Sequence, residues 1–259
     1  MIPSIPRLLG FLLLFNLYSG SVQSSDLPKT LQQIRSGVVA VGTIMPVPHS
    51  AARKPKARFY GTGFVIGNGR KVITNHHVVP EEFNDKKKEV LAIFAGRGKS
   101  AIARKARVLR ADPEHDLALL EFDGPALNPL ELDTQGSIAE GEEVAFTGFP
   151  LGMALGLYPV TNKTIVAAKT PIVIPANSSR KLTAVQIKRL KTPYEVYQLD
   201  AIAYPGNSGS PVYRIDSGKV IGVVNSVFVK GSKEAMLKTP SGISYAIPTR
   251  YIFDLMIKR

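Results

Sequence analysis

Three residues that could act together in nucleophilic catalysis stand beside strand-like apolar runs in this sequence. His77 follows a β-rich run, Asp116 precedes another, and Ser208 lies among glycines and prolines before a third. A serine hydroxyl becomes a nucleophile when an imidazole removes its proton, and a carboxylate fixes the tautomer of that imidazole. The order His77, Asp116, Ser208 therefore predicts a catalytic triad.

The segment Pro205–Pro211 could also supply an oxyanion hole. Gly206 permits backbone conformations that a Cβ atom would forbid, so the N–H groups of Gly206 and Ser208 could point at a developing oxyanion. Glycine, asparagine and serine also build ordinary polar turns, so the segment taken alone leaves a surface β-turn open. Its combination with His77 and Asp116 favours the catalytic interpretation.

Most of the chain reads as short apolar and β-branched runs divided by Gly, Pro, Asn and charged turns. The first series comprises 38–41, 63–66, 71–74, 90–94 and 118–122, and the second comprises 143–147, 163–167, 195–198, 209–213, 220–224 and 243–247. Two sets of about six strands predict either two small β-barrels or one sandwich. The stretch 124–133, which contains Pro125, Pro129 and Asp133, is the expected boundary. Only residues 249–257 show convincing helical spacing, with Pro248 just before them.

Composition limits the classes of function. The chain of 259 residues is 44% hydrophobic and 20% charged, which is ordinary for a globular protein. Its net charge of +13 favours anionic surfaces, lipids or acidic polypeptides. The basic residues are dispersed, however, at 53–54, 86–88, 104–105 and 188–189, in what we expect to be mostly solvated loops. They have no aromatic interleaving and no recognisable motif, which argues against nucleic acid.

The amino-terminal sequence and the cysteine content indicate where in the cell the protein is located. Arg7 is followed by the apolar run Leu8–Phe15 and by small residues at 19–21, which predicts a signal peptide over residues 1–24. The run is shorter than the roughly 20 residues that cross a bilayer, although an uncleaved anchor stays open. The sequence has no cysteine, which excludes thiol catalysis and cysteine metal sites and favours a bacterial cell envelope. We expect an exported protein, periplasmic or secreted, with no metal ion and no cofactor.

The motifs together resemble the trypsin-like peptidases of the chymotrypsin superfamily, most closely the protease domain of the Deg (high-temperature-requirement) group. The residues that carry the resemblance are 61–66, 74–79, 116–120, 148–152, 200–208 and 245–248. The resemblance implies an all-β peptidase domain over 25–259, built of two six-stranded antiparallel β-barrels (chymotrypsin-like) with a short C-terminal helix. The barrels are expected at about 36–128 and 136–248 and the helix at about 249–258. No PDZ domain is expected in the chain, and a homo-oligomer stays open.

The resemblance also assigns roles. In these families the catalytic histidine is the fourth residue of a Thr-x-x-His box, which selects His77 over His76. The chain departs from many relatives at Ser210, where they carry glycine, but glutamyl endopeptidases resemble the version seen here. The implied activity is that of a serine endopeptidase that hydrolyses polypeptides through an acyl-enzyme on Ser208. The alternatives are a weak or inactive peptidase-like binding or chaperone module and, on charge alone, a nucleic-acid-binding β domain.

A substrate pocket follows from the same resemblance. Its expected wall consists of Ile202, Ala203, Asn225, Ser226 and Ile243. No aspartate lies at the expected pocket base, so we do not expect a preference for lysine or arginine. An apolar lining predicts cleavage after small or aliphatic residues, with broad selection because one methylene changes binding by only about 1–3 kcal/mol.

Overall fold

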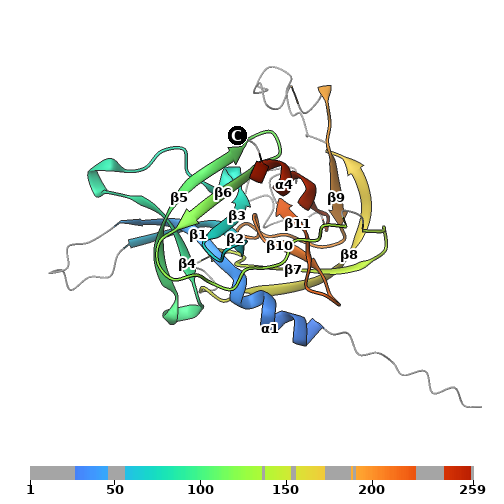
Figure 1. Ribbon diagram of the computed structural model, residues 1–259, viewed down its shortest axis with the longest axis horizontal. Helices are drawn as coiled ribbons and strands as arrows, with labels where there is room; N and C mark the ends of the chain where they lie inside the picture. The colour runs from blue at the N-terminus through green and yellow to red at the C-terminus, as the bar shows by residue number, and fades with distance from the viewer. Residues whose placement is uncertain are drawn as a thin grey trace, which may run out of the picture.

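Two closed β-barrels make up most of the molecule (Figure 1). The computed structural model describes residues 27–45, 56–135, 138–152, 156–172, 188, 191–225 and 242–257. Within these residues the pairing of strands is antiparallel around each barrel, so the two-barrel prediction is confirmed and the sandwich is excluded. The predicted signal segment, residues 1–24, lies outside the described residues.

The first barrel has the strand order β1-β2-β3-β6-β5-β4. These strands are β1 (Val38–Met45), β2 (Lys56–Ile66), β3 (Lys71–Asn75), β4 (Val90–Ala95), β5 (Ile102–Asp112) and β6 (Leu117–Phe122). Side chains alternate between the two faces of a strand, so every second residue points into the barrel. Val39 and Val41 on β1 and Val65 on β2 belong to the resulting buried interior.

The second barrel has the order β10-β11-β12-β9-β8-β7. Its strands are β7 (Glu143–Gly148), β8 (Val160–Pro171), β9 (Glu195–Leu199), β10 (Pro211–Arg214), β11 (Val220–Asn225) and β12 (Ser244–Pro248). Val144, Phe146 and Val224 are among the residues that fill its interior. Each run of the second predicted series coincides or overlaps with one of these strands.

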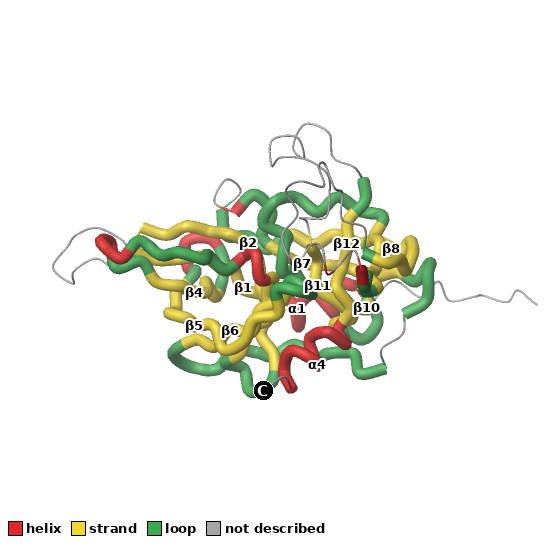
Figure 2. Tube along the Cα trace, turned by 90° about the horizontal axis from the view of Figure 1, so that it is seen from above, coloured by secondary structure: helices red, strands yellow, loops and turns green. Residues whose placement is uncertain are grey.

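The outer faces of the two barrels meet in a shared core. Phe64 and Leu119 from the first barrel and Tyr213 from the second are buried in one apolar cluster. Figure 2 shows the barrels side by side with both helices at their junction. Strands at this junction are therefore apolar on both faces, which explains their uninterrupted hydrophobic runs. In the described part of the chain, no helix is long and apolar enough to cross a membrane.

Two helices cover the junction. Helix α4 (Thr249–Ile257) follows β12 as predicted and packs Ile252 and Leu255 into the shared core. Helix α1 (Leu27–Gly37) was not predicted, so the expectation of a single helical stretch is wrong. Only three residues of this helix are buried, and one of them is polar, so its apolar side is narrow. Ile34 packs in the core and Thr30 donates from Oγ1 to the Ile215 carbonyl at 2.7 Å.

Strand β5 corrects the expectation that Arg104 and Lys105 lie in a solvated loop. The first predicted series lacked this strand because most of its side chains are exposed or half-buried and several are basic. Its backbone pairs with β4 on one edge and β6 on the other. Pairing on both edges stabilises a strand without the apolar alternation that reveals strands in a sequence. Strand β2 begins at Lys56, well before the predicted run 63–66.

Candidate active site

His77 and Asp116 lie together where two paired strands end. Asn75, the last residue of β3, is in register with Leu117, the first residue of β6. His77 lies in the short 3₁₀ turn after β3, and Asp116 immediately precedes β6. The His77 ring Nδ1 is 2.7 Å from Oδ2 of Asp116, and the His77 backbone N–H donates to Oδ1 at 2.9 Å. Both carboxylate oxygens therefore hold the histidine.

The backbone of Asp116 is fixed in an uncommon conformation. Its φ of 55° lies in the left-handed region, which non-glycine residues rarely adopt. Its carbonyl accepts from the His76 N–H at 3.0 Å and from Nδ2 of Asn75 at 3.1 Å. These bonds compensate for the backbone strain and direct the carboxylate at His77.

Asn225 reaches this carboxylate from the second barrel. It is the last residue of β11 and is fully buried, and its Nδ2 donates to Oδ2 of Asp116 at 2.6 Å. The sequence interpretation put Asn225 on the edge of a substrate pocket, whereas its amide is here bonded to the carboxylate. Asn225 therefore links the two barrels at the aspartate.

Burial and hydrogen bonding act on Asp116 in opposite directions. Burial alone raises the pKa of its carboxyl, but the hydrogen bonds and the charge interaction with His77 and the amide of Asn225 outweigh burial. The pKa of Asp116 consequently lies below its ordinary value. An ionised carboxylate in this position can orient a neutral imidazole and stabilise the imidazolium that forms after proton transfer.

Ser208 stands on a tight turn that approaches the first barrel. Its backbone carbonyl accepts from the Thr62 N–H at 2.8 Å, and Ser208 is buried, with 3% of its surface exposed. A Cβ atom added at Gly61 would lie 2.8 Å from the Ser208 carbonyl oxygen and 2.7 Å from a methyl of Val78. Val78 directly follows His77, so one point on β2 is within contact distance of both the histidine segment and the serine turn.

The turn before Ser208 is anchored at its carbonyl groups. The Pro205 carbonyl accepts from the Leu151 N–H at 2.7 Å, and the Gly206 carbonyl accepts from Oγ1 of Thr62 at 2.7 Å. Gly206 has a φ of 101°, and a Cβ there would lie 2.4 Å from the Phe149 carbonyl oxygen. In a trans peptide the N–H points opposite to the carbonyl. Anchoring the Pro205 carbonyl to Leu151 thus directs the Gly206 N–H to the other side of the turn.

The structure brings only some of the remaining predicted pocket residues close to one another. Ala203 is buried, and its N–H donates to Oγ of Ser244 at 2.7 Å, which brings it next to the residue that follows Ile243. Ile202 is half-buried and Ile243 is exposed over 39% of its surface. Ser226 lies outside the described residues.

Sequence reasoning included Thr62 and Asn75 in the family motifs but assigned no role to either side chain. Both are fully buried polar residues within strands, and Thr74, directly before Asn75, is a third. A buried polar side chain needs a partner, so a polar residue inside a strand pattern is the indication that could have drawn attention to them. Among the described residues, no group of three or more His, Cys, Asp or Glu is placed to hold a metal ion.

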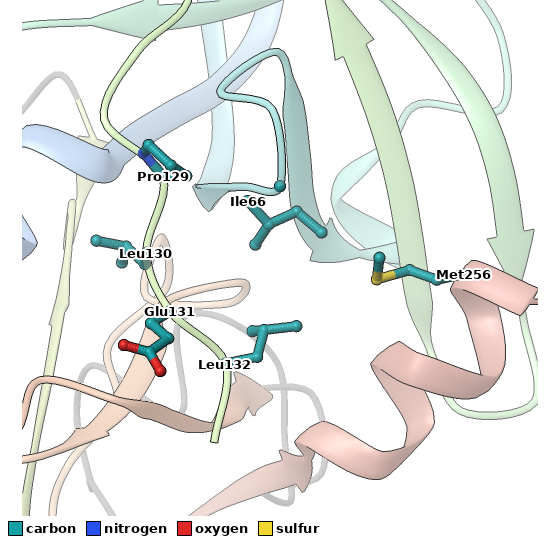
Figure 3. Close-up of a pocket in the computed structure, with 7 residues that line it drawn as sticks. Ile66, Pro129, Leu130, Glu131, Leu132 and Met256 are labelled. Atoms are coloured by element: carbon teal, nitrogen blue, oxygen red, sulfur yellow. The ribbon is translucent and has the colours of Figure 1, made fainter. Parts of the chain in front are cut away.

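A pocket of about 370 Å³ lies elsewhere, between the connection of the two barrels and the end of α4 (Figure 3). Its lining is mostly apolar and consists of Ile66, Gly67, Pro129, Leu130, Glu131, Leu132 and Met256. Glu131 is paired with Lys219 at 3.1 Å. None of the triad candidates borders this pocket, so its position does not bear on their chemistry.

The fold and this arrangement define a class of protein. The chain belongs to the trypsin-like peptidase domain family, whose sequence model matches residues 61–223. The matched region contains His77, Asp116 and Ser208. The resemblance inferred from the motifs is thereby confirmed at the level of the family.

Individual relatives carry related descriptions. A probable periplasmic serine endoprotease, DegP-like, of Pseudomonas fluorescens is 28% identical over 217 residues, covering 82% of this chain and 37% of that protein. A protein of the same description from Halomonas elongata is 28% identical over 219 residues, covering 83% of this chain and 38% of that protein. The chain therefore spans less than two-fifths of the length of these two relatives.

Solved structures of an HtrA-type protease, AlgW, share the fold. The structure of AlgW with a decapeptide superposes with a TM-score of 0.63 at 20% identity and covers 89% of this chain and 66% of that one. A variant of AlgW with a tripeptide gives a TM-score of 0.61, also at 20% identity, and covers 89% of this chain and 62% of that one. This likeness supports the two-barrel architecture.

Proposed function

We propose that this chain is a serine endopeptidase with Ser208 as nucleophile, His77 as general base and Asp116 as the residue that orients the histidine. The observation that carries the proposal is the His77–Asp116 pair, joined at 2.7 Å and held by the amide of Asn225 from the opposite barrel. Membership of the trypsin-like peptidase family and the DegP-like relatives support it.

The proposed reaction proceeds in two steps. The Ser208 Oγ attacks the carbonyl carbon of the scissile peptide bond, and its proton passes to Nε2 of His77. The N–H groups of Gly206 and Ser208 stabilise the oxyanion of the tetrahedral intermediate. His77 then returns the proton to the leaving amine, which breaks the C–N bond and leaves an ester on Ser208. Water, deprotonated by the same imidazole, attacks this ester and releases the carboxylic acid product and the serine hydroxyl.

Polypeptides are the proposed substrates, cleaved after small or aliphatic residues. The AlgW structures, which contain a tripeptide and a decapeptide, support an extended peptide as the bound form. Ile202, Ala203 and Ile243 are the described residues proposed to wall the apolar pocket, and Ser226 belongs to the same proposal. Asn225 contributes to this wall through its backbone, because its side chain is engaged by Asp116.

Export is part of the proposal. The basic and apolar start of the chain and the word periplasmic in the descriptions of its relatives support a cleaved signal peptide over residues 1–24, followed by the peptidase domain. The net charge of +13 supports acidic polypeptides or anionic surfaces as additional partners.

Labelling with a fluorophosphonate probe, followed by a casein cleavage assay, tests the activity. The wild-type protein should be labelled and should cleave casein, whereas Ser208→Ala should do neither while it keeps its thermal unfolding midpoint. Ser100→Ala is the matched control, because it removes an exposed hydroxyl that is distant from Ser208 in the sequence, and it should behave as the wild type. A folded wild-type protein that is neither labelled nor active would favour the alternative of an inactive peptidase-like binding module.

A further inference from the structure

Thr62 uses each of its polar groups within or next to the serine turn. It is a fully buried residue of β2. Its N–H donates to the Ser208 carbonyl at 2.8 Å, and its Oγ1 donates to the Gly206 carbonyl at 2.7 Å. Its own carbonyl accepts from Oγ1 of Thr74 at 2.6 Å. One residue of the first barrel thus contacts two residues of a turn that belongs to the second barrel.

The Thr62 hydroxyl also reaches the segment that follows β7. The Phe149 N–H donates to Oγ1 of Thr62 at 2.9 Å, so the hydroxyl accepts one hydrogen bond and donates another. The same segment anchors the turn a second time, because the Leu151 N–H donates to the Pro205 carbonyl. The hydroxyl therefore lies between the turn and the segment 149–151.

The two carbonyls that Thr62 holds belong to Gly206 and Ser208, the residues proposed to donate their N–H groups to the oxyanion. Glycine has little intrinsic preference for one backbone conformation, and Gly206 adopts a φ of 101°. Stabilisation of the oxyanion requires a donor N–H about 2.7–3.1 Å away. A flexible turn keeps this distance only if residues outside the turn hold its backbone. The hydrogen bond from the Thr62 hydroxyl fixes the peptide plane on the carboxyl side of Gly206.

We propose that Thr62 is a positioning residue of the oxyanion hole, whose hydroxyl holds the Gly206 carbonyl and thereby fixes the backbone between the two donor residues, Gly206 and Ser208. This inference rests on the proposed peptidase function. Thr62 does not touch the substrate in this scheme. Its effect is exerted through Gly206, so it should change stabilisation of the transition state more than binding of the substrate.

The test compares three variants with the wild type. Thr62→Val keeps the shape of the side chain and removes the hydroxyl, and Thr62→Ser keeps the hydroxyl and removes a methyl. Thr30→Val is the matched control, because Thr30 is also a buried threonine whose hydroxyl donates to a remote backbone carbonyl, that of Ile215. Each variant is assayed for kcat, KM, thermal unfolding and affinity for a peptide boronate, whose tetrahedral adduct places an oxygen in the oxyanion hole.

Loss of one oxyanion donor costs about a hundred- to a thousand-fold in kcat, and displacement of the donors should cost less. We expect Thr62→Val to lower kcat by about ten- to a hundred-fold with KM within about threefold, and to weaken boronate binding by a similar factor. Thr62→Ser should recover most of the wild-type kcat. Thr30→Val should lose stability and keep kcat, which separates a loss of packing from a loss of positioning.

The outcomes separate the inference from the function on which it rests. A wild type that cleaves casein while Thr62→Val keeps its kcat overturns the role of Thr62 alone, as does an equal loss of kcat in Thr62→Val and Thr30→Val. A wild type that does not cleave overturns the proposed function, and the role of Thr62 with it. If Thr62→Val does not fold, Thr62→Ala takes its place, and a kcat equal to that of Thr62→Ser would contradict the inference.

Discussion

The side-chain amide of Asn225, on β11 of the second barrel, donates a 2.6 Å hydrogen bond to the carboxylate of Asp116, at the start of β6 in the first barrel. Both side chains are buried, and the carboxylate also holds His77. The position of the histidine therefore depends on the docking of the two barrels as well as on the turn that carries Asp116. Residues 109 positions apart in the sequence meet at one oxygen atom.

Asn225→Leu should lower kcat/KM at neutral pH by about ten- to a hundred-fold. The substitution keeps the approximate volume and removes a hydrogen bond to a charged group, which typically contributes about 1.5–3 kcal/mol. The pKa of Asp116 should rise, because one of the bonds that favour its ionised form is gone. Steady-state kinetics with a peptide substrate measure the effect.

Asn128→Leu is the control for Asn225→Leu. Asn128 is exposed, and its amide donates to the hydroxyl of Ser36 at 3.1 Å, away from the triad candidates. This variant should keep its kcat/KM. An Asn225→Leu protein with unchanged kcat/KM would mean that the link between the barrels does not influence the histidine.

The two adjacent histidines should differ sharply when each is replaced by alanine. His77→Ala removes the group that takes the proton from Ser208 and should lower kcat at least about a thousand-fold. His76 contacts Asp116 through its backbone N–H, which alanine retains, and its side chain is half-buried. We expect His76→Ala to stay within about threefold of the wild type, as most substitutions outside a special site do. Casein cleavage with the reverse order of activities would exchange the roles of the two residues.

The sequence predicted the barrels well where strands are apolar and poorly where they are not. β7 and β11 could be predicted because they are runs of apolar residues, which are buried. β5 is mostly exposed and basic, and it is stabilised by pairing with strands on both edges. An apolar pattern therefore reveals a strand only where one of its faces is well buried, and most residues of β5 are exposed. Helix α1 was missed for a related reason, because only a narrow side of it is buried.

The candidate site shows a different limit. Motif and spacing pointed to His77 and Asp116, which the structure brings together, because each stands next to a recognisable strand. Two further hydrogen bonds cross between the barrels: Asn225 donates to Asp116, and Thr62 donates to the Gly206 carbonyl. Both depend on how the two barrels dock. Local sequence patterns describe one strand at a time and contain no information on contacts of this kind.

Activity should rise by a single ionisation from acid towards neutral pH. His77 must be neutral to accept a proton, and histidine is the side chain that ordinarily changes charge between about pH 5 and 8. Asp116 does not add a second ionisation in this range, because its lowered pKa keeps it charged. A pH profile of kcat/KM on a neutral peptide measures the rise.

His115→Gln is the control for this profile. His115 is a second histidine paired with a carboxylate, that of Asp112, at 2.8 Å, and it is not one of the triad candidates. The profile of His115→Gln should keep the shape of the wild-type profile. A flat profile in the wild type, or one that loses its rise in His115→Gln, would contradict the assignment of His77 as the base.

The connection between the barrels should make the stability of the protein sensitive to acid through Asp133. Burial raises the pKa of this carboxyl, but the hydrogen bond from Nε of Arg214 at 2.8 Å and the backbone N–H of Gln135 outweigh it and lower the pKa. A group whose pKa is lowered by folding stabilises the folded state above its unfolded value of about 3.9, and this contribution is lost as the pH falls through the folded value. Asp133→Asn should therefore lower the free energy of unfolding by about 1–3 kcal/mol at pH 7.

At about pH 3 the difference between Asp133→Asn and the wild type should be smaller than at pH 7, because this pH lies below the unfolded pKa of about 3.9 and the unfolded wild type is then stabilised by taking up a proton. Urea unfolding at the two pH values measures both differences. Asp123→Asn is the control, because Asp123 is an exposed aspartate at the end of β6, and it should change the free energy of unfolding by less than about 0.5 kcal/mol at either pH. A difference for Asp133→Asn that does not depend on pH would show that the charge of Asp133 does not stabilise the junction between the barrels.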